Sequence, residues 1–430
     1  MSLWRMILTA ISLVSARFGG AGIALASQIL LARLLPQSDV GVIFLGMSAT
    51  AIMSVLVTAG YPALAMVWLP RYYALGRRNL VDAFHGAFWK DALKATVAVA
   101  LVTAAMIALA PIEAGYKIAL LFGLLSSPST ALIRMNSSVA NSLRRYQLSY
   151  VPDFIVRPGF LLAFLVAAWL ARWPLNVVMV LTAFVVGNTI VAVVQALYIG
   201  HEGSVPPPFR QPTRDIAPQL RGKAMSLVIV AIVGNSFSDL VNLTGGMFLP
   251  AKDVAVLGVC VRLAALIGFV TQATQNFVLP DLAKALTSGV QNEVNSLLLR
   301  INTVALGAVA ACVLGTVVLG GYAMRLFGPD YVMGHWPLVL FTISQGLRAA
   351  SGMNQHLLSF GGFQARTAGA CLAAMITLGI AARILSPMYG VMGMGYAVVL
   401  ADLVWAAILA HQAQRYAGRR GDIVALLRQA

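Results

Sequence analysis

Hydrophobic runs, broken at intervals by Pro, Gly and clusters of charge, follow one another along the whole chain. Most are about 20 residues long, the length at which an α-helix crosses the hydrocarbon core of a bilayer. We therefore predict an all-α integral membrane protein of about twelve transmembrane helices. The predicted spans are 13–35, 40–62, 90–110, 117–140, 149–171, 175–199, 223–248, 254–279, 300–320, 335–358, 365–386 and 391–412.

The polar stretches between these runs predict the domain organisation. Segments 64–89 and 281–299 have the mixed pattern of amphipathic connectors at the membrane surface, and 201–222 is a long polar, Pro-rich stretch near the middle of the chain. We predict an N-terminal six-helix lobe at 1–200, a cytoplasmic linker at 201–222, a C-terminal six-helix lobe at 223–412 and a cytoplasmic tail at 413–430.

A short motif occurs twice. Residues 35–43 read LPQSDVGVI and residues 249–257 read LPAKDVAVL, an offset of 214 residues that also places Arg134 on Arg348. In each copy the motif joins the first two helices of a half, where we expect Asp39 or Asp253 to cap the next helix. The pattern predicts a parallel repeat of two six-helix lobes, with a substrate cavity expected between the halves.

Composition agrees with a membrane protein, since 60% of residues are hydrophobic, 10% are charged and the mean hydropathy is +0.84. The net charge of +16 is explained by positive residues that gather in cytoplasmic loops. With the N-terminus inside, 19 Lys and Arg fall on the cytoplasmic side and 6 on the other, so both termini are predicted to be cytoplasmic. The six are Arg33, Lys117, Arg172, Lys252, Arg325 and Arg383.

Eight of the ionisable residues inside predicted spans are candidates for a functional role, and each costs about 2–3 kcal/mol to insert. The basic residues, predicted to line a cationic substrate cavity, are Arg17, Arg134, Arg157, Arg262 and Arg348. The acidic residues are Asp153, Asp239 and Asp402. The surplus of positive charge suits a pyrophosphate group, because guanidinium stays charged when desolvated and binds phosphate oxygens in pairs.

A purely structural interpretation of these charges stays open. Asp153 and Arg157 are four residues apart on one helix and could neutralise each other, and Arg262 could pair with Asp239. Asp239 and Asp402 could bind a coupling ion or proton, or could form salt bridges between helices. Asp402 has no obvious partner in the sequence.

Uncharged polar residues also interrupt the apolar helices. Amide side chains both donate and accept hydrogen bonds, so they suit sugar hydroxyls, although bonds between membrane helices are their commoner role. The candidates for the polar lining of the cavity are Gln28, Gln272, Gln275 and Asn276. The three cysteines lie in apolar runs without the spacing of metal ligands, and neither a metal site nor a cofactor is expected.

The segment RFGGAGIALASQILLARLLPQSDVGVIFLG at 17–46, followed by RYYALGRRN at 71–79, resembles the opening of Wzx-type polysaccharide flippases. These belong to the multidrug/oligosaccharidyl-lipid/polysaccharide exporter superfamily. Their signature, A-R-L-L-[GP] and an acidic turn before a Gly-led helix, is matched by Ala32–Pro36 and Asp39–Gly41.

The resemblance implies a fold like that of MATE transporters, with alternating access between two lobes. It implies an undecaprenyl-diphosphate-linked oligosaccharide as cargo, flipped across a bacterial inner membrane for lipopolysaccharide or exopolysaccharide export. The expected partners are the lipid-linked anionic glycan, membrane lipids and other polysaccharide assembly proteins, and not nucleic acid.

Two other functions stay open as alternatives. A MATE-like cation-coupled multidrug antiporter is expected to offer carboxylates to its cargo, typically in the first helix, where this chain has Arg17. A membrane-embedded enzyme acting on lipid-linked glycans needs a catalytic motif and a large outer loop. The sequence has no nucleotide-binding loop, paired His-Glu motif or nucleophile elbow, and its longest predicted outer loop is 321–334, so no catalytic activity is expected.

Overall fold

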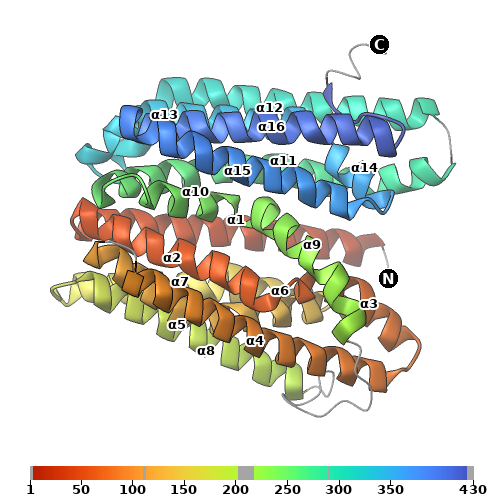
Figure 1. The fold of residues 1–430 in the computed structure, drawn as a ribbon, viewed down its shortest axis with the longest axis horizontal. Helices are drawn as coiled ribbons and strands as arrows, with labels where there is room; N and C mark the ends of the chain where they lie inside the picture. Colours follow the sequence, from red (N-terminus) through yellow and green to blue (C-terminus); the bar gives the residue numbers. More distant parts are fainter. Residues whose placement is uncertain (1–2, 110–112, 202–216, 289–290, 424–430) are drawn as a thin grey trace. The chain divides into compact units, whose positions relative to one another are not determined.

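A computed structural model describes residues 3–109, 113–201, 217–288 and 291–423 of the chain. Every regular element in these ranges is a helix (Figure 1). The chain divides into two compact units, Met1–Ile232 (unit 1) and Val233–Ala430 (unit 2).

Unit 1 is built around α5, which contacts α2, α3, α4, α6 and α8. Its π-helix, η1, sits between α6 and α7 and continues directly into α7. The elements of unit 1 are α1 (Leu3–Leu34), α2 (Gln37–Thr58), α3 (Tyr61–Ala74), α4 (Arg78–Leu109), α5 (Ala114–Ser142), α6 (Tyr146–Tyr150), η1 (Val151–Val156), α7 (Arg157–Leu170), α8 (Val177–His201) and most of α9 (Ala217–Asn235).

In unit 2, α16 packs along α15 and α13, while α13 also contacts α11 and α12 (Figure 1). A short 3-10 helix, η2, precedes α13. The elements are α10 (Phe237–Gly246), α11 (Ala251–Ser288), α12 (Gln291–Arg325), η2 (Pro329–Gly334), α13 (His335–Ala350), α14 (Asn354–Phe360), α15 (Gln364–Tyr389) and α16 (Val391–Tyr416).

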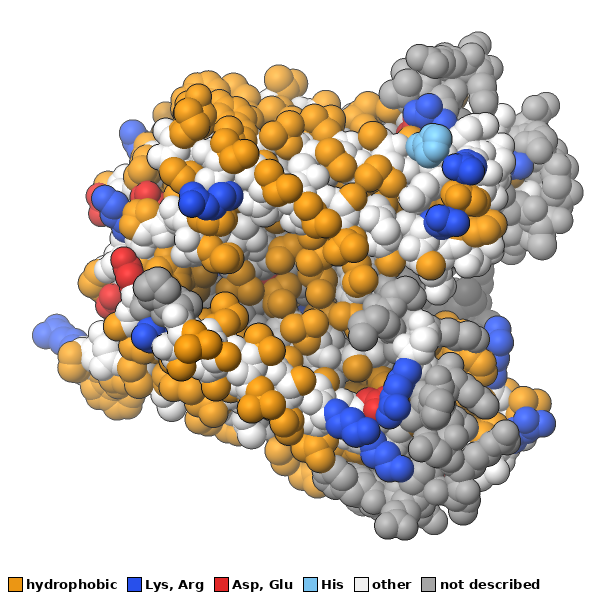
Figure 2. Space-filling view, viewed as in Figure 1, with side chains coloured by type: hydrophobic (Ala, Val, Ile, Leu, Met, Phe, Trp, Pro, Cys, Tyr) orange, Lys and Arg blue, Asp and Glu red, His pale blue; other side chains and the backbone are white. Residues whose placement is uncertain are grey.

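Eight helical segments in the described residues are long and apolar enough to cross a membrane, and α9 with α10 would make a ninth. A shorter apolar helix covers Phe18–Leu34. Hydrophobic side chains run along the helices, and Lys and Arg gather towards the helix ends (Figure 2). The prediction of an all-α integral membrane protein with about twelve transmembrane helices is confirmed.

The repeat extends through both units. α8 begins at Val177 and α16 at Val391, while α2 begins at Gln37 and α11 at Ala251, so equivalent helices start 214 residues apart. The long helices α4 and α12 correspond in the same way, each having its start and end within two residues of that offset. The offset suggested by one nine-residue motif therefore also describes where several whole helices begin.

The expected capping role of the repeated aspartates is wrong. Asp39 is the third residue of α2 and Asp253 the third of α11, and in α2 the N-cap position belongs to Pro36, which offers no side-chain bond. The amide N–H groups of Asp39 and Asp253 each donate to the preceding proline carbonyl, at 3.0 and 2.9 Å. The carboxylates instead lie in the first turn, where the helix dipole favours negative charge.

Two predicted spans are broken in the structure. The span expected at 223–248 divides into α9 and α10, and that at 335–358 divides into α13 and α14. At the second break Gly352 adopts φ +60°, and a Cβ there would collide with the Gly421 carbonyl, so the turn requires glycine. The connectors expected at 64–89 and 281–299 are largely helical, in α3, α4, α11 and α12.

The segment after α16 forms hydrogen bonds with the turn between α13 and α14. The Gly421 carbonyl accepts hydrogen bonds from Asn302 Nδ2 at 2.7 Å and from the Met353 amide at 3.3 Å. The Gly421 amide donates to Asn354 Oδ1 at 2.7 Å, and Asp422 accepts from Asn354 Nδ2 at 3.2 Å. These bonds join the segment after α16 to α12 and to the turn that follows α13, whose last turn carries Arg348.

Candidate functional site

A polar network inside unit 1 joins three helices around Arg157. Its Nε donates to Asn188 Oδ1 on α8 at 2.8 Å, and its Nη1 lies 3.3 Å from Asp153 Oδ1 on η1. Asn188 Nδ2 in turn donates to Ser126 Oγ on α5 at 2.7 Å and contacts Thr130 Oγ1 at 3.4 Å. One guanidinium and one amide thus connect η1 and α7 to α8 and α5.

The π-helix η1 places Asp153 in this network. Pro152 cannot donate a backbone hydrogen bond, and the wider π turn accommodates the missing bond within an otherwise continuous helical segment. α1 approaches η1 so closely at Gly20 that a Cβ there would collide with the Phe154 carbonyl. A glycine in α1 is therefore what allows the first helix to pack beside the network.

The corresponding network in unit 2 is centred on Asp402, a fully buried carboxylate on α16. Arg348 Nε on α13 donates to Asp402 Oδ1 at 3.0 Å, and Ser344 Oγ donates to Oδ2. The Arg348 guanidinium carbon lies 4.1 Å from the ring centroid of Phe237 and 5.3 Å from that of Trp405. A cation between two aromatic faces is stabilised there by the ring quadrupoles.

Arg348 has further hydrogen-bonding capacity. Nη1 points to the Val233 carbonyl at 3.5 Å, at the limit of a hydrogen bond. Nη2 is buried and has no partner among the described residues. Because an unsatisfied buried donor costs about 1–3 kcal/mol, donation from Nη2 to an additional acceptor would be favourable.

The two networks occupy equivalent positions of the repeat. Thr130 and Ser344 are 214 residues apart, and so are Asn188 and Asp402. Within each unit the hydroxyl residue on α5 or α13 contacts its polar partner on α8 or α16. The arginines differ in origin, because Arg157 comes from α7 whereas Arg348 comes from α13, at the position equivalent to Arg134.

Arg262 and Asp239 are both half-buried in unit 2, on α11 and α10. Arg262 Nη1 donates to the Gly258 carbonyl of its own helix at 3.2 Å. The pairing of Arg262 with Asp239 stays a prediction. In unit 1, Arg134 is half-buried on α5.

The predicted polar lining is described only in part. Gln28 is half-buried on α1, and Gln275 Nε2 contacts the Gly352 carbonyl at 3.4 Å, beside the break after α13. The side chains of Arg17, Gln272 and Asn276 lie outside what the structure describes. Among the described residues, no group of His, Cys, Asp and Glu has the arrangement of a metal site.

Two of the predicted intramembrane acids, Asp153 and Asp402, form ion pairs with arginines. The alternative of an Asp153–Arg157 ion pair is confirmed, and Asp402, which has no obvious partner in the sequence, is paired with Arg348. Ser344 and Thr130 were not among the sequence candidates. Alignment of the two halves at the 214-residue offset would have found both, because it places hydroxyl on hydroxyl and Asn188 on Asp402.

No known protein family matches the chain, and no curated protein does. Solved structures share its fold. The lipid II flippase MurJ, in an inward closed conformation, has a TM-score of 0.74 with 14% identity, covering 94% of this chain and 87% of that one. An inward-facing multidrug resistance MATE family transporter of the MOP superfamily has a TM-score of 0.69 with 12% identity, covering 95% and 96%.

A third similar structure is a MOP superfamily transporter from Pyrococcus furiosus, described as having a binding pocket of reverse polarity. Its TM-score is 0.61 with 11% identity, over 94% of this chain and 95% of that one. At such identities the likeness concerns the fold. The chain thus has the MATE-like fold that its sequence predicts.

Proposed function

We propose that this protein is a flippase that moves an undecaprenyl-diphosphate-linked oligosaccharide from the cytoplasmic to the periplasmic leaflet by alternating access. The fold shared with MurJ and MATE transporters supports a transporter of this superfamily. The cargo class, its use in surface polysaccharide export and the bacterial inner membrane follow from the resemblance to Wzx-type flippases.

The observation that carries the anionic cargo is the partnering of the acids. Asp153 forms an ion pair with Arg157, and Asp402 forms one with Arg348. A cationic drug would have to compete with these guanidinium groups for each carboxylate. An anionic head group instead meets arginines that still have donors to offer, as Arg348 Nη2 does.

The proposed role of the arginines follows from guanidinium geometry. Arg17, Arg134, Arg157, Arg262 and Arg348 hold the diphosphate, with two parallel N–H···O bonds to a phosphate group where the approach allows. The lipid tail stays in the bilayer while the sugar enters the polar interior. The π-helix η1 and the break between α13 and α14 adjoin the two networks, and they are the points at which we expect the helices to bend.

The test is a flipping assay with purified protein in proteoliposomes, using a fluorescent diphosphate-linked glycolipid and a reagent that quenches only the outer leaflet. Alanine variants of Arg134, Arg157, Arg262 and Arg348 are expected to slow flipping about tenfold or more where a guanidinium–phosphate contact is lost. Lysine variants, which keep the charge but not the fork, should be intermediate. Arg366→Ala, which removes an exposed guanidinium that contacts Tyr416, is the matched control.

Normal flipping by all four alanine variants at wild-type abundance would show the anion-cavity proposal to be wrong. Export of cationic drugs without glycolipid flipping would favour the multidrug antiporter. Formation of a glycosidic bond by the purified protein would favour an enzyme.

A further inference from the structure

The turn between α7 and α8 holds an arginine in an unusual backbone conformation. Arg172 has φ +53°, in the left-handed region, where glycine is the usual residue after a helix. Its amide donates to the Trp169 carbonyl at 3.2 Å and the Trp173 amide donates to the Ala168 carbonyl at 3.0 Å, which ends α7. A side chain here costs about 1–2 kcal/mol that glycine would avoid. Arg172 therefore occupies a position whose backbone conformation favours glycine.

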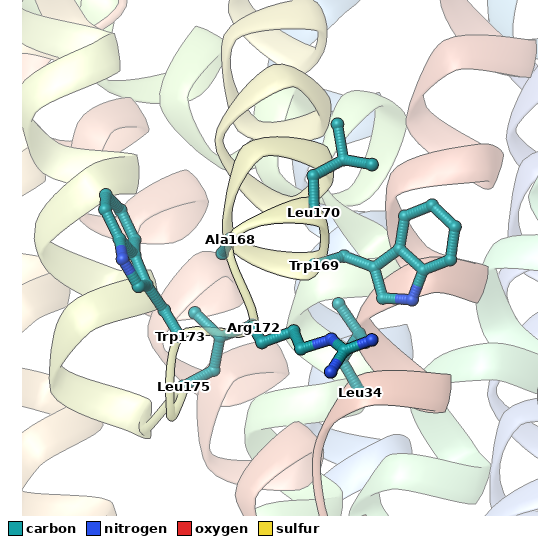
Figure 3. A pocket seen from close by; sticks show the side chains of 7 residues that line it. All are labelled: Leu34, Ala168, Trp169, Leu170, Arg172, Trp173 and Leu175. Atoms are coloured by element: carbon teal, nitrogen blue, oxygen red, sulfur yellow. The ribbon is translucent and has the colours of Figure 1, made fainter.

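A cavity of about 470 Å³ opens beside this turn. The Arg172 side chain extends across it between Trp169 and Leu34 of α1, while Trp173 lies on the other side of the helix end (Figure 3). Ala168, Leu170 and Leu175 complete the lining. The cavity combines one cation with two indole rings, at the junction of α1, α7 and the turn.

The cavity lies at the end of a helical segment that is long and apolar enough to cross a membrane. Trp169 is 58%, Leu170 70% and Trp173 53% exposed, at the end of an apolar segment long enough to span. Indole rings at such a level form the aromatic belt of membrane proteins, with the apolar ring towards the acyl chains and the N–H towards the head groups. The phosphates of membrane lipids are therefore expected near this end of the segment.

The charge of Arg172 has no topological explanation. It is one of only six Lys and Arg predicted on the non-cytoplasmic side, where positive residues are not needed to orient the chain. Guanidinium, by contrast, is the side chain best suited to a phosphate, and the indole N–H groups of Trp169 and Trp173 can donate to further oxygens.

We propose that this cavity binds the head group of an anionic membrane phospholipid. Arg172 pairs with the phosphate, and the exposed apolar surface of Trp169 and Leu170 contacts the acyl chains. The site lies within unit 1 at a helix end, and it is separate from the arginines proposed to hold the transported head group. It therefore does not depend on the nature of the cargo.

The experiment titrates phosphatidylglycerol into the purified full-length protein in a mild detergent and counts bound lipids by native mass spectrometry. Arg172→Gly is expected to weaken the apparent Kd about tenfold, as loss of a charge-assisted contact to phosphate does. Arg172→Lys should weaken the apparent Kd about threefold and Trp169→Ala about two- to fivefold. Each of these variants removes only part of the contact with the lipid. Arg172→Gly should also raise the melting temperature without added lipid, because glycine relieves the strained backbone.

Arg144 supplies the matched control. It has φ +59° at the end of α5, its amide donates to the Asn141 carbonyl, and the next amide closes the turn on Ala140, as at Arg172. Arg144→Gly should relieve the same backbone strain. It should not change the binding of phosphatidylglycerol at Arg172.

Four outcomes would overturn the proposal. These are unchanged lipid binding in Arg172→Gly, equal loss in Arg144→Gly, equal binding of phosphatidylcholine, and competition by millimolar inorganic phosphate, which would indicate a site for soluble anions.

Discussion

Equivalent positions of the two halves carry an amide, Asn188, in unit 1 and a carboxylate, Asp402, in unit 2. The two side chains form different sets of hydrogen bonds. Asn188 accepts a hydrogen bond from Arg157 and donates one to Ser126 on α5. Asp402 can only accept, and its two oxygens are filled by Arg348 and Ser344.

The second difference is where the charge is placed. In unit 1 the ion pair lies on one helical segment, and the side chains of Arg157 and Asp153 are 21% and 29% exposed. In unit 2 the pair joins α13 to α16, and Asp402 is 0% exposed. Both units thus have a polar contact between helices at the repeated positions. In unit 2 this contact includes a carboxylate, that of Asp402, whose charge is balanced by the guanidinium of Arg348.

Removing Arg348 should have the largest effect. Arg348→Met leaves a buried carboxylate without its counter-charge, which costs about 3–5 kcal/mol. The double variant Arg348→Met/Asp402→Leu should recover most of this loss, because it removes the unpaired charge. Denaturant unfolding of the purified protein in mixed micelles would measure both, and equal instability of the single and double variants would contradict the buried-pair account.

Removing Arg157 should cost less, about 2 kcal/mol, because it takes away a charged hydrogen bond to Asn188 while Asp153 keeps contact with solvent. The same unfolding measurement on Arg157→Met compares the two halves directly. A loss as large as that of Arg348→Met would show that exposure does not distinguish the two networks.

Asn188→Asp, which gives unit 1 the carboxylate that unit 2 has at Asp402, should lower the free energy of unfolding by about 1–2 kcal/mol. In Asn188→Asp the Ser126 and Thr130 hydroxyls can rotate to donate, but two carboxylates then share Arg157. Adding Asp153→Asn should restore stability, because it leaves one carboxylate for one guanidinium. Thermal unfolding of both variants tests this coupling, and a double variant less stable than the single would contradict it.

The smallest expected contrast concerns the equivalent hydroxyls. Ser344→Ala removes one of the two donors to a buried carboxylate and should cost about 1 kcal/mol, whereas Thr130→Val should cost about half of that. The reason is that Asn188 keeps its 2.7 Å bond to Ser126 when the longer contact to Thr130 is lost. Differential scanning fluorimetry on the two variants would detect the difference, and equal shifts would show that the hydroxyls are equivalent.

Much of the fold could be predicted because hydropathy is a local property of the chain. The apolar runs gave the number and approximate place of the helices, and the LPQSDVGVI and LPAKDVAVL motifs gave a repeat that the helix boundaries follow. The breaks after α9 and α13 were missed, because only a few polar residues mark each one within a long apolar run. They are Asn235 and Ser236 at the first break and Ser351 and Asn354 at the second. The second break depends on Gly352, whose tight turn is visible only against Gly421.

The sequence by itself determined that this chain is a two-part bundle of membrane helices with more arginines than acids inside it. It also found the Asp153–Arg157 pair, because four residues separate neighbours on a helix face. Only the tertiary structure decided that Asp402 belongs to Arg348, 54 residues away, and that Asn188 reaches Ser126 across 62. Such partners are set by the packing of α13 on α16 and of α5 on α8, which no local pattern encodes.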